Sequence, residues 1–168
     1  MFAVFLRYSF MTLVCKQHFF TFFDKFTVSD LNGNPVYLVN SRFSFGHFLE
    51  ISDMNGNILG VVREKVFRML SEFDFYLGSS DVPVGTLKRR FTFLKPKYDL
   101  SCMGLEVYGD VFGYNYCIKN SFGQTVVTVS KKFLALTDSY QIDVADAFNP
   151  LLALMVVIAI DAEHCGQD

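Results

Sequence analysis

The chain has 168 residues, of which 51% are hydrophobic and 19% charged, and it contains 20 Phe but no Trp. This length predicts one domain, and so much Phe predicts a thick aromatic core. The formal net charge of −2 does not suggest a nucleic-acid-binding protein, and four cysteines without a CxxC pair do not suggest a disulfide-stapled secreted domain.

The first residues, MFAVFLRYSFMTLVC, are apolar but carry no basic leader region and no small-residue cleavage site. The stretch is interrupted by Arg7 and is too short to cross a bilayer, which needs about 20 apolar residues. We therefore predict an N-terminal extension over residues 1–10 and a single domain over residues 11–168. A membrane-contacting N-terminal segment is the alternative.

Two segments share the pattern Ser-Asp-x-Asn-Gly-Asn: VSDLNGNPVYLV (28–39) and ISDMNGNILGVV (51–62). An EF-hand calcium loop needs glycine at its sixth position, where these segments place Pro35 and Ile58. Asn-Gly between alternating apolar residues is instead a strong β-hairpin signal, with positive φ at both turn residues. We predict two equivalent hairpins, with Asn32-Gly33 and Asn55-Gly56 at their tips, and no metal site.

Strand-like runs and turn signals alternate from residue 13 to about residue 144. A basic residue lies at or near Phe at the start of four segments, each of which leads through a short break into a strand. These segments are RFSFGHFLEIS (42–52), KVFRMLSEFDFY (65–76), RRFTFLKPKYDLS (89–101) and KKFLALTDSYQID (131–143). Repetition of one hairpin unit around an axis predicts a β-barrel.

The end of the chain departs from the β pattern, because residues 151–160 form an uninterrupted apolar run. Asn149 is a good N-cap and Pro150 suits the first helical position. Periodicity alone does not separate a buried helix from a central strand here, and the β-branched residues weaken the helix assignment. A segment that is apolar on every side must be surrounded by protein, so we predict a central helix over residues 149–162. His164 and Cys165 are expected beyond that helix.

The sequence resembles the LURP-one-related family of the tubby C-terminal-like superfamily, and its short bacterial members in particular. The resemblance is carried by residues 26–62, RRFTFLKPKYDL (89–100), GQTVVTVSKKFLALTDSYQIDVAD (123–146) and LLALMVVIAID (151–161), in the order and spacing of the family. It implies an all-β fold with one helix: a closed antiparallel barrel of about twelve strands around the buried C-terminal hydrophobic helix.

No group of residues predicts catalysis, so we expect a protein that is not an enzyme and has no cofactor. His18 follows Cys15 at a C-x-x-H spacing, but no second pair completes a zinc site. His47 follows Phe45-Gly46 and suggests a turn. Adjacent His164 and Cys165 rarely converge as a Cys–His nucleophile would require.

Paired basic residues begin two of the repeat units, directly before Phe91 and Phe133. The candidate anion- or lipid-binding residues are therefore Lys88, Arg89, Arg90, Lys131 and Lys132. Equivalent hairpins would present these charges at one level of the barrel, and the two phenylalanines would anchor the strands in the core. A lysine or arginine near an anionic membrane contributes about 1 kcal/mol of binding free energy. The alternative is that these are solubilising charges that protect strand edges from aggregation.

Two functions follow from these readings. The first is a binding module for anionic phospholipid headgroups, cytoplasmic and peripheral at the membrane, as the resemblance implies through phosphoinositide-binding tubby domains and scramblase-like relatives. The second is a soluble structural or protein-interaction module with an unknown protein partner and no lipid role. The lipid function rests on likeness of fold, which by itself is weak support.

Overall fold

The computed structural model describes residues 10–16, 25–93, 96–100, 103–134 and 137–165. The predicted extension over residues 1–10 lies almost wholly outside them, as does His18. Twelve strands and one helix follow in chain order: β1 (Phe10–Lys16), β2 (Lys25–Ser29), β3 (Pro35–Ser44), β4 (Gly46–Ser52), β5 (Ile58–Glu64), β6 (Glu72–Leu77), β7 (Gly85–Arg90), β8 (Lys97–Leu100), β9 (Leu105–Asp110), β10 (Asn115–Asn120), β11 (Thr125–Leu134), β12 (Thr137–Ala145) and α1 (Pro150–Cys165).

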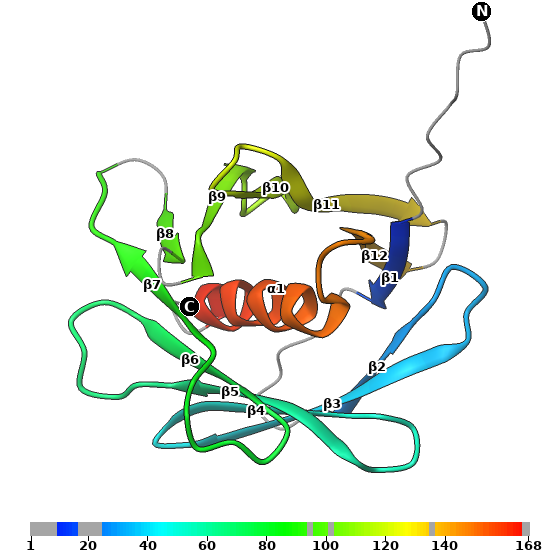
Figure 1. Cartoon of the computed structure of the whole chain (residues 1–168), viewed down its shortest axis with the longest axis horizontal. Helices are drawn as coiled ribbons and strands as arrows, with labels where there is room; N and C mark the ends of the chain where they lie inside the picture. The colour runs from blue at the N-terminus through cyan, green and yellow to red at the C-terminus, as the bar shows by residue number, and fades with distance from the viewer. Residues whose placement is uncertain (1–9, 17–24, 94–95, 101–102, 135–136, 166–168) are drawn as a thin grey trace, which may run out of the picture.

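The strands form a closed antiparallel barrel with α1 inside it, as Figure 1 shows. Each strand pairs with its neighbours in sequence, and the barrel closes where β1 pairs with β12 from Phe10↔Ala145 to Lys16↔Ser139. On its other side β1 meets β2 at a single residue pair, Val14↔Ser29. The predicted barrel around a central helix is confirmed, although its first strand begins at Phe10 rather than near residue 13.

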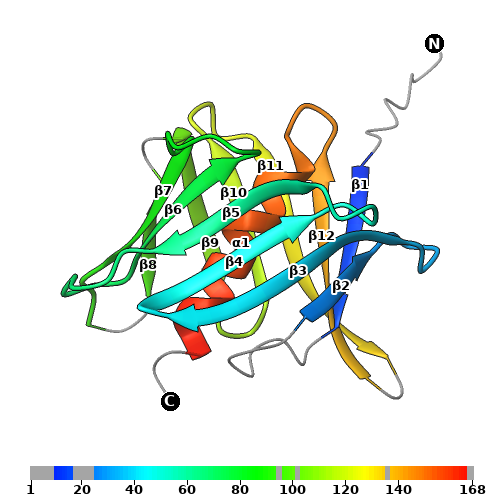
Figure 2. The ribbon, with the colours of Figure 1, turned by 90° about the horizontal axis from the view of Figure 1, so that it is seen from below.

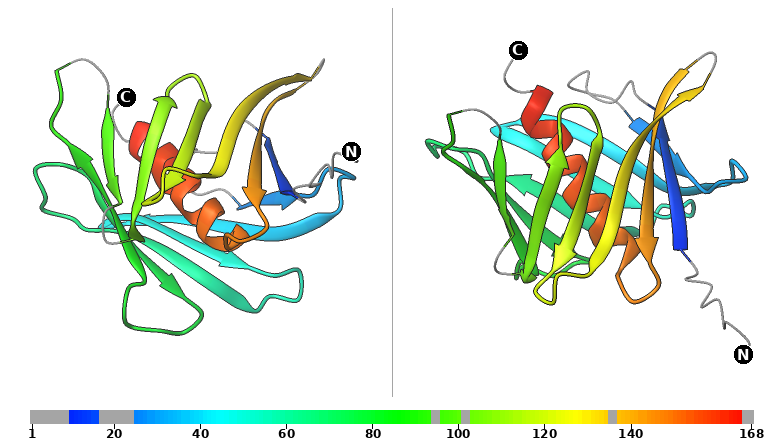
Figure 3. Two further views of the ribbon diagram at one scale, coloured as in Figure 1. Left: turned by 45° about the horizontal axis from the view of Figure 1, so that its top comes forward. Right: turned by 90° about the horizontal axis from the view of Figure 1, so that it is seen from above.

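The two ends of the barrel are distinct because antiparallel strands alternate in direction. All odd-numbered strands finish at the end where α1 also finishes, which we call the exit end (Figures 2 and 3). Arg89, near the finish of β7, contacts Glu163, near the finish of α1. The opposite end, where α1 begins, is called the entry end. There Met155 packs over Gly60, which lies near the start of β5 and leaves room for the sulfur.

Helix α1 fills the barrel, and every residue from Ala153 to Ala162 is at most 2% exposed. Asn149 caps the helix as predicted, because its side-chain oxygen accepts a hydrogen bond from the Leu151 backbone N–H at 2.9 Å. The prediction that His164 and Cys165 lie beyond the helix is wrong, since α1 continues to Cys165. The last turn of the helix can lie inside the barrel because Arg89 and Tyr98 on the barrel wall contact its polar side chains.

The repeated turns are held by their own aspartates. The Asp30 carboxylate accepts hydrogen bonds from the backbone N–H groups of Asn32 and Asn34 at 2.8 Å and from the Asn34 side chain at 2.9 Å. Asp53 makes the same contacts in the second hairpin, and Asn120 holds a third turn of this type. These bonds lower the pKa of both aspartates.

The conformation of these turns differs in one respect from the prediction. Positive φ occurs at Gly33 (83°) and Gly56 (87°) but not at the asparagines before them. The hydrogen bond from the Gly33 N–H to the Asp30 carbonyl places Leu31 and Asn32 at the centre of a four-residue turn. The glycine therefore supplies the left-handed residue that follows the turn, rather than the second residue of a two-residue loop. The absence of calcium binding stays a prediction.

Candidate functional site

The barrel is polarised in charge along its axis. Among the charged side chains that the structure describes, exposed acids lie at the entry end (Asp81, Glu106 and Asp146), whereas Asp110 is the exposed acid at the exit end. Every lysine and arginine with a described side chain, apart from Lys119, lies toward the exit end. The exposed ones are Lys25, Arg42, Arg63, Arg68, Lys88, Arg90, Lys97 and Lys132. A protein of net negative charge therefore presents one basic end.

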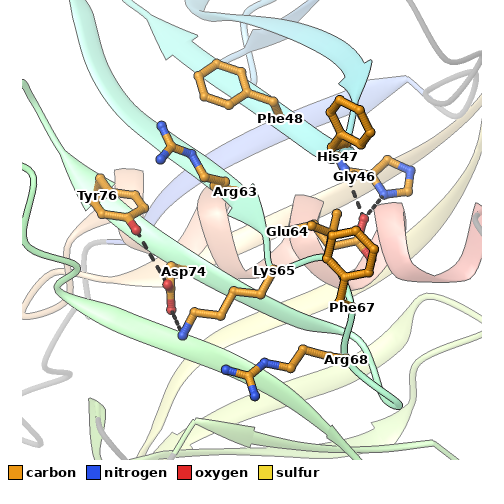
Figure 4. A pocket seen from close by; sticks show the side chains of 12 residues that line it. Gly46, His47, Phe48, Arg63, Glu64, Lys65, Phe67, Arg68, Asp74 and Tyr76 are labelled. Atoms are coloured by element: carbon orange, nitrogen blue, oxygen red, sulfur yellow. Dashed lines mark hydrogen bonds and ion pairs between the residues drawn. The ribbon is translucent and has the colours of Figure 1, made fainter.

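A hollow of about 720 Å³ opens on the outer side of β4, β5 and β6 toward the exit end. Figure 4 shows its side chains, which come from these strands and from the β3–β4 and β5–β6 connections. The lining residues are Phe45, Gly46, His47, Phe48, Arg63, Glu64, Lys65, Val66, Phe67, Arg68, Asp74 and Tyr76. We call this the β4–β6 hollow.

Two arginines give the β4–β6 hollow its positive character. The Arg63 guanidinium lies 5.5 Å from the ring centroids of both Phe48 and Tyr76, which restricts its orientation through cation–π contacts. Arg68 lies on the exposed β5–β6 connection. Neither arginine forms an ion pair with any residue that the structure describes, so their charges face the solvent at the hollow.

The acids of the hollow are occupied by other partners. Glu64 accepts hydrogen bonds from the His47 ring at 2.7 Å and from the His47 backbone N–H at 2.9 Å, and the ring contact lowers the pKa of Glu64. Asp74 accepts a hydrogen bond from Thr86 at 2.6 Å and forms an ion pair with Lys65 at 3.0 Å. His47 is buried in β4 rather than placed in a turn, which corrects the prediction for that residue.

Lys65 is neutralised within this network. Its ammonium lies 2.7 Å from the Glu72 carboxylate as well as close to Asp74, and the hydrogen bond to Glu72 raises the pKa of Lys65. Arg63 and Arg68 are therefore the positive charges of the hollow that form no ion pair within the described chain, although Arg68 lies near enough to Glu72 to help lower the pKa of that carboxyl. This arrangement can receive an anionic group beside an aromatic wall.

The five residues predicted from the sequence all lie toward the exit end, but they form two separate groups. On β7, Lys88 lies 3.7 Å from Glu72, and Arg90 lies 3.1 Å from Asp99. Lys131 and Lys132 lie on β11, so that β8, β9 and β10 separate them from β7. The structure does not bring the five together as one site, and their role in anion binding stays a prediction.

Two details of that prediction need correction or restriction. Phe91 does not anchor β7 in the core, because it is 75% exposed in the connection after that strand. The side chain of Phe133 lies outside the described part of the chain. Sequence reasoning also missed Arg63 and Arg68 as site residues. The signal that could have found them is the basic segment REKVFR (63–68), which precedes a predicted strand.

Arg89 belongs to a polar cluster at the buried end of α1. Its guanidinium donates to Glu163 at 2.5 Å, and the Glu163 side chain is 1% exposed. Tyr98 donates to the other oxygen of Glu163 at 2.7 Å and lies 3.0 Å from the His164 ring nitrogen. Two residues before Glu163, Asp161 accepts a hydrogen bond from Tyr114. Both carboxylates within α1, those of Asp161 and Glu163, therefore have hydrogen-bond donors from the barrel wall.

The buried Asp161 predicts a pH dependence of stability. Burial raises its pKa from 3.8 to about 6, although the Tyr114 hydrogen bond opposes the shift. The stabilisation from a raised carboxyl pKa is fully present below the unfolded-state pKa and is lost as the pH rises through about 6. Relative to Asp161→Asn, the native chain should lose roughly 2–3 kcal/mol of unfolding free energy between pH 4 and pH 7.

Urea denaturation of both proteins across this pH range measures the difference. Asparagine retains an oxygen that accepts from Tyr114, so the variant is a matched reference. Identical pH profiles for the two proteins would show that Asp161 does not titrate in this window.

Comparison with known proteins finds a family that matches nearly the whole barrel and most of α1. The model of the family described as LURP-one-related matches residues 11–161. The chain belongs to the LURP-one-related family. It is 30% identical over 151 residues to the uncharacterized protein YxjI of Bacillus subtilis (strain 168), an alignment that covers 89% of this chain and 91% of YxjI.

A solved structure supports the same fold for this LURP-one-related protein. The X-ray structure of a protein from Arabidopsis thaliana superimposes with a TM-score of 0.66 at 17% identity, and covers 92% of this chain and 91% of the plant chain. Within the described residues, no three His, Cys, Asp or Glu side chains are grouped so that they could hold a metal ion. None of the described helices has the length and hydrophobicity needed to span a bilayer.

Proposed function

We propose that this LURP-one-related protein is a non-catalytic binding module that recognises anionic, phosphate-bearing headgroups at its exit end. The observation that carries the proposal is the concentration of exposed lysine and arginine at that end, where Arg63 and Arg68 line the β4–β6 hollow without an ion pair among the described residues. The module would act as a peripheral protein at the cytoplasmic face of a membrane.

The chemistry of the hollow favours an oxyanion. A guanidinium presents several N–H donors in a planar fork that matches two phosphate oxygens, and it keeps its charge at any physiological pH. The Phe48 and Tyr76 rings hold Arg63 in place, which reduces the side-chain entropy lost on binding. Exposed Lys132 adds to the positive field that attracts an anion toward this end, whereas Lys88 and Arg90 are partly offset by Glu72 and Asp99.

Isothermal titration calorimetry with inositol 1,4,5-trisphosphate, the water-soluble headgroup of an anionic lipid, tests the proposal. Arg63→Gln combined with Arg68→Gln should weaken binding at least about tenfold, since each charged hydrogen bond contributes about 1.5–3 kcal/mol. Binding by the native chain should also weaken as the salt concentration rises.

Lys119→Gln is the matched control, because it removes one positive charge from the entry end. It should bind inositol trisphosphate as the native chain does. Equal affinity of the double arginine variant and the native chain would contradict the proposal. Absence of any binding by the native chain would favour the alternative, a protein-interaction module without an anionic ligand.

A further inference from the structure

Phenylalanine side chains crowd the exit end without contributing to the core. Five of them are exposed there, with Phe67 at 95% and Phe93 at 93%: Phe45, Phe67, Phe91, Phe93 and Phe112. At the entry end the exposed phenylalanine of the described chain is Phe122, at 86%. We call the five residues the phenylalanine rim.

The phenylalanine rim follows neighbouring connections around the barrel. Phe45 lies between β3 and β4, Phe67 between β5 and β6, Phe91 and Phe93 between β7 and β8, and Phe112 between β9 and β10. These connections are successive, and all of them lie at the end where α1 finishes, as Figure 2 shows. The rings therefore occupy one arc of the exit end rather than scattered positions.

The backbone conformation of Phe67 supports a functional role for its exposed ring. Phe67 has a φ of 63°, in the left-handed region that a bulky residue rarely adopts. The connection that holds it is closed by a hydrogen bond from the Lys65 N–H to the Glu72 carbonyl at 2.7 Å. An exposed aromatic ring on a strained backbone gains nothing from core packing, and strain of this kind concentrates at functional sites.

The charges beside the phenylalanine rim indicate which kind of surface the rim contacts. Arg68 lies in one of these connections, and exposed Arg42, Lys88 and Arg90 lie on the adjoining ends of β3 and β7, where they pair with the less exposed Glu50, Glu72 and Asp99. Asp110 is the exposed acid found there in the described chain. Aromatic rings beside basic residues suit the boundary of an anionic bilayer, where rings enter the apolar layer and cations meet the headgroups. Apolar insertion and electrostatic attraction together give the two signals that stable peripheral binding needs.

We propose that the phenylalanine rim inserts into the surface of an anionic phospholipid bilayer, so that the barrel docks end-on with its exit end toward the membrane. This inference rests on the proposed binding of anionic headgroups and adds the source of the headgroup and the orientation of the barrel. The rings supply affinity that is independent of the headgroup, and the arginines supply the preference for negative charge.

Vesicle co-sedimentation of the full chain tests the inference. The vesicles contain phosphatidylcholine alone or phosphatidylcholine with 30% phosphatidylserine. The native chain should bind the anionic vesicles in preference to the neutral ones. Phe67→Ser combined with Phe93→Ser should weaken that binding at least about tenfold, given the apolar area of two rings. Phe122→Ser is the control with an equally exposed ring at the opposite end, and it should bind as the native chain does.

A second arm separates this inference from the proposed function. The double phenylalanine variant should still bind inositol trisphosphate with native affinity, whereas the double arginine variant should lose it. Native vesicle binding by the phenylalanine variant would overturn membrane insertion while leaving headgroup recognition intact. Failure of the native chain to bind anionic vesicles would also overturn membrane insertion. Sedimentation showing a native dimer that the phenylalanine variant dissolves would assign the rim to a second copy of the chain and would likewise overturn the inference.

Discussion

Replacing Leu154 with aspartate should prevent the barrel from folding. Leu154 is fully buried in α1, and the helix is enclosed by the barrel wall on every side. The substitution removes a large apolar side chain, at a cost of about 2–5 kcal/mol, and adds a carboxylate with no partner. The sum approaches or exceeds the whole stability of a typical domain, which is about 5–15 kcal/mol.

Circular dichroism and the yield of monomeric protein on gel filtration measure this effect. Leu31→Asp is the matched control, because Leu31 is 66% exposed in the first hairpin turn and should accept the same change with little loss. A Leu154→Asp variant that expresses and melts as the native chain does would show that α1 is not enclosed by the barrel.

Replacing Arg89 with alanine should lower the free energy of unfolding by about 3 kcal/mol. The change takes the guanidinium away from the Glu163 carboxylate, which is 1% exposed and also accepts a hydrogen bond from Tyr98. Removing one partner of a buried ion pair is strongly destabilising, because the remaining charge stays desolvated. Arg89 is itself 27% exposed, so the expected loss lies at the lower end of the range for such pairs.

Chemical denaturation of three variants isolates the cause. Glu163→Gln combined with Arg89→Ala removes the stranded charge and should recover most of the stability lost in Arg89→Ala alone. Equal destabilisation in the single and double variants would mean that Arg89 acts through packing rather than through its charge. For the same reason, charge reversal at Arg89 is a poor test of lipid binding, whereas Arg63 and Arg68 can be changed without disturbing the core.

The sequence predicted the architecture because its signals for strands and helix are local. Asn-Gly turns at Asn32 and Asn55 mark hairpins, and a run that is apolar on every side, from Leu151 to Ile160, must be enclosed by protein. The resemblance to the LURP-one-related family supplied the strand number and the closure of the barrel. The turn geometry was harder to predict, since the same Asn-Gly pair fits more than one hairpin loop.

The candidate site was predicted only in part, because its features are not local. The Arg89–Glu163 pair spans 74 residues, and nothing in either segment indicates that the two side chains meet. The exposure of Phe91, which was predicted to anchor its strand in the core, was also missed, as was that of Phe93 two residues later. Their exposure follows from the length of the β7–β8 connection, which carries both rings past the end of β7.

The most direct test of end-on docking uses the absence of tryptophan from the chain. Phe93→Trp and Phe122→Trp each introduce a single fluorophore, one at the phenylalanine rim and one at the entry end. In anionic vesicles that contain brominated phospholipid, we expect a blue-shifted emission and strong quenching for Phe93→Trp, and unchanged emission for Phe122→Trp. Quenching of Phe122→Trp, or equal behaviour of the two proteins, would contradict docking through the basic, phenylalanine-rich exit end.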